Sequence, residues 1–316
     1  MADIYLHARL VEDVVDKMSG DIRKDIAILG AQGPDPLYYS MFHKNFSTYK
    51  KYADDMHRYD TGKLLINMTN YVKEHYNKET YSFLVGFISH YALDVKIHPY
   101  VYYNVGIFEK DKPETHPWRG LHLKFERSID AAMIEKELGI PSRKIKLTKN
   151  HFTIKHISTE IKELFKNTLQ NQYNEPSGDI IYTYCIKEMY NSINRIITDR
   201  FGIKKQVLKI GNLFTKSHDM ILSDLSFFNH TEKVDYLNIK KNTWHHPITN
   251  KEYNYSVIEL YDQAITFANE MISKVTDYIL KNKDIDLTEV FTNLSYNSGL
   301  PCDHTRPFKY FNIYRK

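Results

Sequence analysis

Three side chains of the metal-ligand type recur at every fourth position in the apolar stretch 81–98. His90, Asp94 and His98 stand at i, i+4 and i+8, and on an α-helix each step of four residues rotates the side chain by only about 40°. The three side chains therefore share one face of the expected helix. Burying them without partners would cost several kcal/mol, whereas one divalent cation satisfies all three. A set of core histidines hydrogen-bonded to the backbone is the alternative.

A second pair of the same kind occurs further along the chain. His122 and Glu126 are four residues apart in a helix predicted over 119–138, so they also share a face. On its own, this spacing is common on solvated helix faces. Two such helices facing each other, however, are the means by which helical bundles build metal sites. Because imidazoles predominate among the candidate ligands, zinc is favoured over iron.

The elements that must position these side chains are helices. Apolar residues recur with the helical period of 3.6 residues, and Gly, Pro and capping residues mark the ends. The expected helices cover 4–18, 21–29, part of 41–59, 62–76, 79–97, 119–138, 151–172, 179–200, 204–222 and 255–282. No segment alternates convincingly with the two-residue period of a strand, and no internal repeat is apparent. The sequence therefore predicts an all-α protein.

Two irregular segments lie close to the candidate ligands in the sequence. Asp35 stands between Pro34 and Pro36, and we expect it on a constrained loop. Residues 99–118 contain three prolines and one glycine, and we expect a connection of about 20 residues there. Loops of that length are usually functional.

Composition excludes several kinds of protein. With 316 residues, 42% of them hydrophobic, the chain can bury a large core. Cys185 and Cys302 are far apart, which argues against a disulfide scaffold and a thiolate zinc site, so a metal must use nitrogen and oxygen ligands. The net charge of +4 is mild and the lysines are scattered, so neither a nucleic-acid nor an anionic-membrane footprint stands out.

Targeting and catalytic motifs narrow the choice further. No stretch reaches the roughly 20 apolar residues of a transmembrane helix, and the N-terminus lacks the apolar core of a secretory signal. We therefore expect a cytoplasmic protein. P-loop, GxGxxG and GxSxG motifs are missing from the sequence, so nucleotide folds and covalent serine hydrolysis have no support. The sequence leaves the oligomeric state open.

Three short motifs resemble the bacterial zinc-dependent phospholipase C family, which is similar to the S1/P1 nucleases. They are HYALDV at 90–95 with His98, HLKFE at 122–126, and HRYD at 57–60. The resemblance covers about residues 1–130, looks most like the intracellular branch of the family, and implies an all-helical fold with three zinc ions in a cleft. We expect residues 1–140 to form the metal-binding core and residues 141–316 to add helices packed on the same domain.

The resemblance implies one metal site around the GPD loop. His90 and Asp94 would bind the first metal together with Asp35 and His57. Asp94 would also bridge to another zinc. Asp35, within reach of a bridging water, would accept its proton as general base. Asp35 and Asp94 are therefore the expected catalytic residues.

The resemblance implies two further sets of ligands. His98, His122 and Glu126 would hold the more separate zinc. His7 matches the histidine of the remaining metal, which in the family is completed by the amine and carbonyl of an N-terminal tryptophan. Only six residues precede His7 in this sequence and none is tryptophan. We therefore expect that third ion to be weakly held, differently liganded or absent.

These ligands predict a hydrolase. Two zinc ions about 3.5–4 Å apart polarise a phosphoryl oxygen and lower the pKa of a bridging water toward about 7. We predict a phospholipase C-like, zinc-dependent phosphodiester hydrolase with two to three zinc ions, acting on a phospholipid or another phosphodiester. An S1/P1-like nuclease is one alternative, for which stacking aromatics are plentiful but the charge balance is not suggestive. A non-catalytic helical protein in which zinc serves folding is the other.

Overall fold

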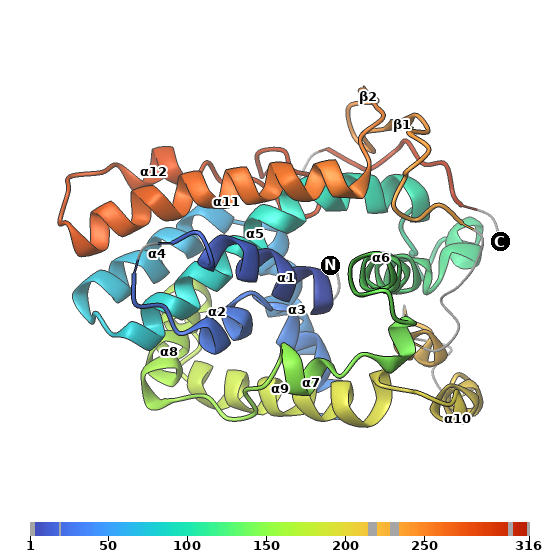
Figure 1. The fold of residues 1–316 in the computed structure, drawn as a ribbon, viewed down its shortest axis with the longest axis horizontal. Coiled ribbons are helices and arrows are strands. Elements are labelled where there is room, and N and C mark those ends of the chain that lie inside the picture. Colours follow the sequence, from blue (N-terminus) through green and yellow to red (C-terminus); the bar gives the residue numbers. More distant parts are fainter. Residues whose placement is uncertain (1–3, 19, 214–219, 228–233, 303–305, 315–316) are drawn as a thin grey trace.

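The chain folds into helices packed around one central helix, as a computed structural model shows (Figure 1). The structure describes residues 4–18, 20–213, 220–227, 234–302 and 306–314. The N-terminal elements are α1 (Ile4–Val15), α2 (Lys24–Gly30), the 3₁₀ helix η1 (Asp35–Ser40), α3 (Phe46–Arg58), α4 (Thr61–Glu74) and α5 (Lys78–Val105). The prediction of an all-α fold, with further helices in the C-terminal part, is confirmed.

Shorter elements separate the remaining long helices. After α5 come η2 (Pro113–Trp118), α6 (Leu121–Leu138), η3 (Ser142–Lys144), α7 (Leu147–Asn150), α8 (Thr159–Tyr173), α9 (Gly178–Ser192) and the π-helix η4 (Ile193–Ile197). The last elements are α10 (Ile203–Gly211), η5 (Leu222–Leu225), the antiparallel strands β1 (Trp244–His245) and β2 (Glu252–Tyr253), α11 (Val257–Leu280) and α12 (Leu287–Val290). The two-residue strands were not predicted.

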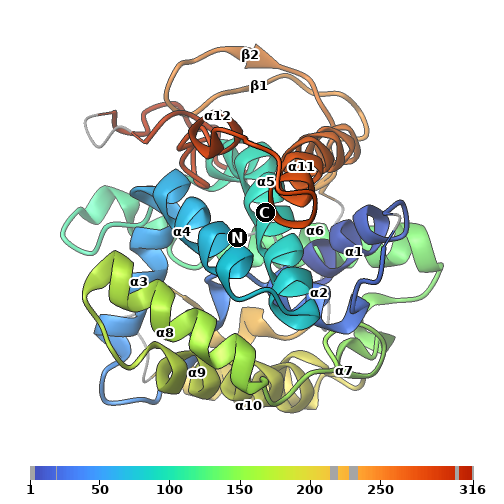
Figure 2. The same cartoon turned by 90° about the vertical axis from the view of Figure 1, so that its left-hand side faces the viewer.

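Helix α5 is the centre of the packing. Helices α2 and α11 lie along it, and α1, α4, α6 and α8 also contact it, an arrangement that Figure 2 shows end-on. Nearly all residues of α5 are buried, which is typical of a helix that is apolar on every side. Its three polar ligand candidates are therefore enclosed by other helices rather than by solvent.

Helix α5 is longer than the sequence predicts. The expectation that residues 99–118 form one connection is wrong, since the helix continues through Pro99 to Val105. A proline inside a helix removes one hydrogen bond and costs about 3 kcal/mol. Burial of Tyr100, Val101 and Tyr103 in this last part offsets the cost, because each such side chain contributes about 1.5–3 kcal/mol.

Other predicted boundaries change at helix ends. The helix predicted over 151–172 begins only at Thr159, after the short α7. The helix predicted over 204–222 ends at Gly211, and residues 214–219 of that range lie outside the described residues. Among the described helices, none combines the length and the apolar composition that crossing a membrane requires.

Two glycines let α2 and α5 pack in backbone contact. A Cβ atom at Gly86 would lie 2.0 Å from the carbonyl oxygen of Ala27, and one at Gly30 would lie 2.1 Å from that of Phe83. Because glycine has no Cβ atom, the two helices can approach this closely, and the chain that follows α2 passes beside His90. This contact positions the loop that carries Asp35.

Candidate metal centre

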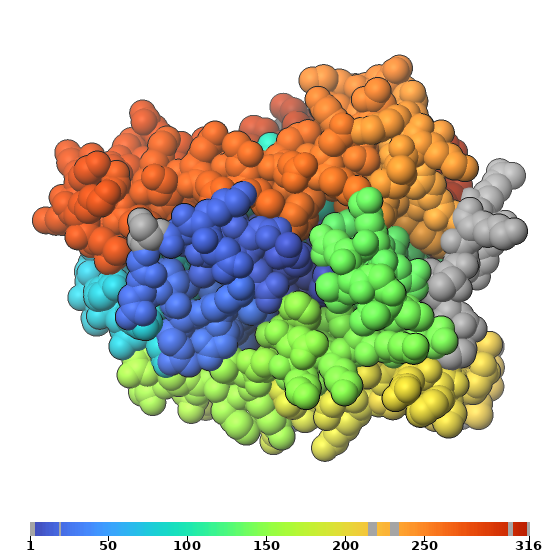
Figure 3. All heavy atoms as spheres, viewed as in Figure 1, coloured from blue at the N-terminus to red at the C-terminus, as the bar shows by residue number. Residues whose placement is uncertain are grey.

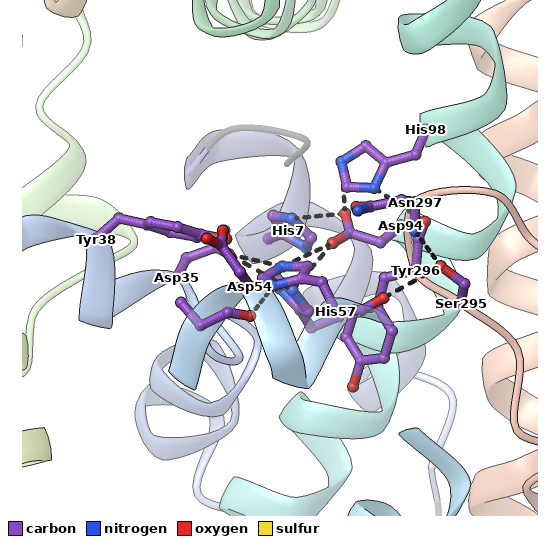
Figure 4. A network of polar contacts seen from close by, with 12 residues as sticks. His7, Asp35, Tyr38, Asp54, His57, Asp94, His98, Ser295, Tyr296 and Asn297 are labelled. Carbon is purple, nitrogen blue, oxygen red and sulfur yellow. Dashed lines mark hydrogen bonds and ion pairs between the residues drawn. The ribbon is translucent and has the colours of Figure 1, made fainter. Parts of the chain in front are cut away.

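All eight ligands expected from the sequence belong to three neighbouring groups in the helical interior. Figure 4 labels five of them, His7, Asp35, His57, Asp94 and His98. Among the described residues, three groups of side chains have potential ligand atoms within 4.8 Å of one another. They are His7, His90 and Asp94; Asp35, His57 and His90; and His98, His122 and Glu126. The side chains come from five different elements, α1, η1, α3, α5 and α6. Their roles as ligands are still a prediction.

The first set surrounds a point between η1, α3 and α5. Asp35 Oδ1 lies 3.3 Å from His57 Nε2 and 3.8 Å from His90 Nε2. Asp94 Oδ2 lies 3.6 Å from His57 Nε2 and 3.1 Å from His90 Nε2. A tetrahedral zinc ion with bonds of about 2.0–2.1 Å has its ligand atoms about 3.3 Å apart. The ligand atoms of Asp35, His57 and His90 all lie within 4.8 Å of one another, so these three side chains fit one zinc ion, with Asp94 beside both imidazoles.

The second set joins α5 to the start of α6. Glu126 Oε1 lies 3.2 Å from His98 Nε2 and 2.9 Å from His122 Nε2. Glu126 is buried, whereas His122 is partly exposed. Two imidazoles and one carboxylate provide three ligands, which is the number that a catalytic zinc site uses while keeping a position for water or substrate.

Asp94 faces both sets. Its Oδ2 points to His57 and His90, while its Oδ1 lies 3.7 Å from His98 Nε2 and 3.4 Å from His7 Nε2. Burial raises the pKa of this carboxyl, but the neighbouring imidazoles of His98, His90 and His7 lower it well below its usual value. Asp94 is therefore an ionised carboxylate whose two oxygens are directed at different groups of imidazoles.

Backbone carbonyls fix the orientation of three imidazoles. The Nδ1 atoms of His57, His90 and His98 lie 2.7 Å from Ala53 O, 2.9 Å from Ala31 O and 3.0 Å from Tyr296 O. A carbonyl oxygen can only accept, so each Nδ1 carries the proton. Each Nε2 is left with its lone pair directed at the cluster, as in metal-binding histidines generally. The Nε2 atoms of His57 and His90 make no hydrogen bond with any described residue.

Three of the imidazoles, those of His7, His57 and His98, are neutral at pH 7. Burial lowers the pKa of His57 and of His7 to about 4, and it lowers the pKa of His98 well below its usual value. Metal ligands must be deprotonated. The burial that makes these residues costly without a partner therefore also keeps them in the form that binds metal.

A tight bend at Gly33 positions Asp35. Gly33 has φ of 53°, and a Cβ atom there would lie 2.5 Å from the His90 ring. The carbonyl of Gly33 accepts a hydrogen bond of 3.1 Å from the Tyr182 hydroxyl. Asp35 then follows as the first residue of η1, so the constrained loop of the sequence analysis is a bend that runs into a 3₁₀ helix.

His7 lies beside two other candidate ligands, Asp94 and His90. Asp130 of α6 accepts hydrogen bonds from the backbone of Tyr5 and Leu6, and so fixes the start of α1. The His7 ring stacks on His90 at 4.1 Å between ring centroids. Neither His7 nitrogen has a hydrogen-bond partner among the described residues. A metal here would share His90 and Asp94 with other sites, so it has the poorest ligand set of the three.

The structure predicts stepwise release of metal from this unequal centre. In a chelator titration of the zinc-loaded protein, we expect an early step that His7→Ala abolishes while later steps stay unchanged. His98→Ala, which removes one imidazole from another set, is the matched control and should keep the early step. Zinc content is measured at each chelator concentration. Release of all zinc in one step that His7→Ala does not alter would show that His7 binds no metal.

A pocket of about 240 Å³ opens onto the centre. Its lining includes His57 from the first set and His122 and Glu126 from the second. His7, His90 and Asp94 do not line it and lie deeper. A molecule in this pocket would therefore contact side chains of two ligand sets at once.

Sequence reasoning missed the residues that complete the site. The carbonyl oxygen of Tyr296 holds His98, and its N–H donates to the carbonyl of His57 at 2.9 Å. Asn297, Tyr102 and Arg58 line the pocket. Arg58 follows a candidate ligand directly, which was a usable signal. No sequence signal marks Tyr296 and Asn297, because only the folding of the chain brings them close to the candidate ligands.

A helical fold with buried clusters of histidine and carboxylate fits a metal-dependent phosphodiesterase. The model of the family described as zinc dependent phospholipase C matches residues 6–178. Since the match covers more than half of the chain, the protein belongs to the zinc-dependent phospholipase C family. No curated protein and no solved structure matches the chain. All eight candidate ligands lie inside the matched range, whereas Tyr296 and Asn297 lie outside it.

Proposed function

We propose that the protein is a phospholipase C-like phosphodiester hydrolase that uses two or three zinc ions. The observation that carries this proposal is the pocket, because its wall contains residues of two ligand sets. A structural zinc site is closed by four protein ligands, whereas a catalytic site keeps a position open to water or substrate. Bound zinc would polarise a phosphoryl oxygen and activate water.

The two catalytic residues expected from the sequence have distinct positions. Asp94 is completely buried between the imidazoles, so its part is to hold the centre together. Asp35 is also buried, but it lies beside His57, which lines the pocket. A carboxylate at this edge can accept the proton of an attacking water. We therefore assign the general base to Asp35 and the bridging position to Asp94.

The pocket lining favours a single phosphodiester over a polynucleotide. Among the described lining residues, the two side chains that carry a full positive charge are Lys50 and Arg58. Lys50 Nζ bonds to Asp54 Oδ2 at 2.8 Å, and Arg58 makes no ion pair with a described residue. A nucleic-acid groove needs a track of cations along the backbone. One available guanidinium instead suits one phosphate.

The other walls of the pocket are largely aromatic. They include Tyr38, Phe46, Tyr102, Phe108 and Trp118. Such walls suit the glycerol and first acyl carbons of a phospholipid, because apolar surface is buried there. They also suit a stacked base, so a nuclease is the competing outcome of the test below.

The test measures zinc and hydrolysis on the same preparation. We expect at least two zinc equivalents, since seven or more ligands are too many for one tetrahedral ion. Substrates are a short-chain phosphatidylcholine, bis(p-nitrophenyl) phosphate and single-stranded DNA, each with and without chelator. Phosphorylated headgroup should be released from the phospholipid, and chelator should abolish the release. Zinc at full content with no hydrolysis of any substrate would establish a structural role, and cleavage of DNA alone would establish a nuclease.

Arg58 is expected to bind the substrate phosphate. Arg58→Ala should lower kcat/KM for phosphatidylcholine by about 10- to 100-fold, the effect of a charge-assisted hydrogen bond of about 1.5–3 kcal/mol. Arg58→Lys should recover part of the loss, since lysine keeps the charge without the forked geometry. Zinc content should not change in either variant. Arg195→Ala, an exposed arginine away from the pocket, is the control. Equal kcat/KM for Arg58→Ala and Arg195→Ala would refute the assignment.

A further inference from the structure

Helix α10 has its large apolar side chains on the outside. None of its residues is buried. Ile203, Val207 and Ile210 stand at i, i+4 and i+7, which is one helix face, and they are 67%, 63% and 63% exposed. Phe201, just before the helix, is 73% exposed. In Figures 1 and 3 the helix lies at an edge of the molecule, in the yellow part of the chain.

The helix is nevertheless fixed to the protein at both ends. Buried Asp199 accepts hydrogen bonds from the backbone N–H groups of Gly202 and Lys205, both at 2.9 Å. At the other end, Asn212 exchanges hydrogen bonds of 3.0 and 3.2 Å with Ser223 of η5. Polar contacts at both ends thus hold the helix in an orientation in which its apolar face is exposed. A surface helix of a globular protein normally has the reverse orientation.

The charges of this segment have one sign. Between residues 200 and 213 the chain contains four basic residues and no acidic one. The basic residues are Arg200, Lys204, Lys205 and Lys209. An exposed apolar stripe on a cationic helix is the pattern of helices that lie in the interface of a bilayer and bind anionic lipids. Four basic residues are thus close in sequence to this apolar face, although the ammonium of Lys204 donates to the carbonyl of Thr198.

Helix α10 is connected to the mouth of the pocket. Element η5 packs against both α10 and α6. Just before η5, Met220 lines the pocket and its carbonyl accepts a hydrogen bond of 3.0 Å from Arg119 Nη2. The next residue, Ile221, packs against Gly120 at the start of α6. A surface bound by α10 would therefore lie close to the entrance of the candidate active site.

We propose that α10 docks the protein on anionic membranes, with the face of Ile203, Val207 and Ile210 placed among the lipids. Charge complementarity favours this occupant over a second copy of the chain, because two copies would bring their basic residues together. Membrane binding stands apart from the proposed function, since it rests on the outer surface alone. The proposed function adds that the bound membrane contains the substrate.

The test is co-sedimentation with vesicles. The vesicles contain either phosphatidylcholine alone or equal parts of phosphatidylcholine and phosphatidylglycerol. One variant combines Ile203→Asn, Val207→Asn and Ile210→Asn. The matched control combines Ile180→Asn, Ile239→Asn and Leu280→Asn, which are also large exposed apolar residues. A second variant, Arg200→Glu with Lys209→Glu, tests the charge. Thermal melts confirm that all variants are folded.

We expect the wild type and the control to bind the anionic vesicles and to bind phosphatidylcholine at least about ten-fold more weakly. The α10 variant and the charge variant should each lose at least about ten-fold in binding to anionic vesicles. Equal binding by the α10 variant and its control would overturn the proposal. A second result would also overturn it. In that result, the wild type does not bind vesicles and is a dimer in sedimentation velocity, whereas the α10 variant is a monomer.

Hydrolysis provides a separate measurement. The α10 variant should hydrolyse bis(p-nitrophenyl) phosphate at the wild-type rate but should be slower on vesicles. Because sedimentation requires no turnover, failure of the proposed hydrolysis would leave the vesicle result intact. A loss of activity on vesicles without a loss of binding would contradict docking by α10.

Discussion

Asp94→Asn is expected to reduce hydrolysis on the order of a thousand-fold and to remove zinc from the protein. The carboxylate is completely buried, and its two oxygens are directed at four imidazoles. An amide has the same shape but neither the charge nor two equivalent acceptors. Loss of several kcal/mol of charge stabilisation at the centre corresponds to about three powers of ten in rate.

Glu126→Gln is the matched comparison. It makes the same exchange of carboxylate for amide, but Glu126 contacts only the imidazoles of His98 and His122 among the ligand candidates. We expect a smaller loss of activity than in Asp94→Asn, together with the loss of about one zinc equivalent. Zinc content and kcat are measured for both variants. If Asp94→Asn keeps all its zinc and near-normal turnover, Asp94 does not bridge two metals.

Removal of zinc is expected to lower the Tm by at least about 10 °C. Eight polar side chains meet in the core, and without metal several of them lose a partner. Metal that binds only the folded chain stabilises it by its binding free energy, and in a chain of this size each kcal/mol is worth about 2 °C. Calorimetry with chelator, followed by return of zinc, measures the change. An unchanged Tm would mean that the centre is stable without metal.

The stability of the metal-free protein should also depend on pH. Burial lowers the pKa of His7 and His57 to about 4 in the folded state, whereas in the unfolded chain it is about 6.5. Between these values the unfolded chain binds more protons, so stability falls as the pH drops from about 6.5 to about 4. Melts of the metal-free protein at pH 7 and pH 5 should show this decline. His7→Ala should weaken it, because one of the two groups is then absent.

The shared face of the candidate ligands within each helix was predictable because helical spacing is local, whereas His7, Asp35 and His57 were expected only from the family resemblance. His90, Asp94 and His98 needed only a helix to share a face, and α5 provides it. The end of α5 was not predictable, since burial against distant elements outweighs the cost of Pro99. The hydrogen bond from His98 to Tyr296 joins residues 198 positions apart, and no sequence pattern indicates such a pair.

The periodicity of α10 shows a different limit. The spacing of Ile203, Val207 and Ile210 predicts a helix with one apolar face, but it does not say which side that face meets. The ordinary assumption places apolar residues inside, whereas the structure exposes them. The same apolar spacing thus occurs on helix faces that are buried and on faces that are exposed, and only the packing of the whole chain distinguishes the two cases.

The contacts of Tyr296 have a consequence for the order in which the chain would fold and bind metal. Its N–H binds the carbonyl of His57 and its carbonyl binds the imidazole of His98, so one residue near the C-terminus joins the two ligand sets. On the ribosome, the matched range 6–178 is synthesised long before residue 296. The nascent chain therefore carries the candidate ligands without the contact that orients two of them, and we expect any zinc to bind only after residue 296 has been synthesised.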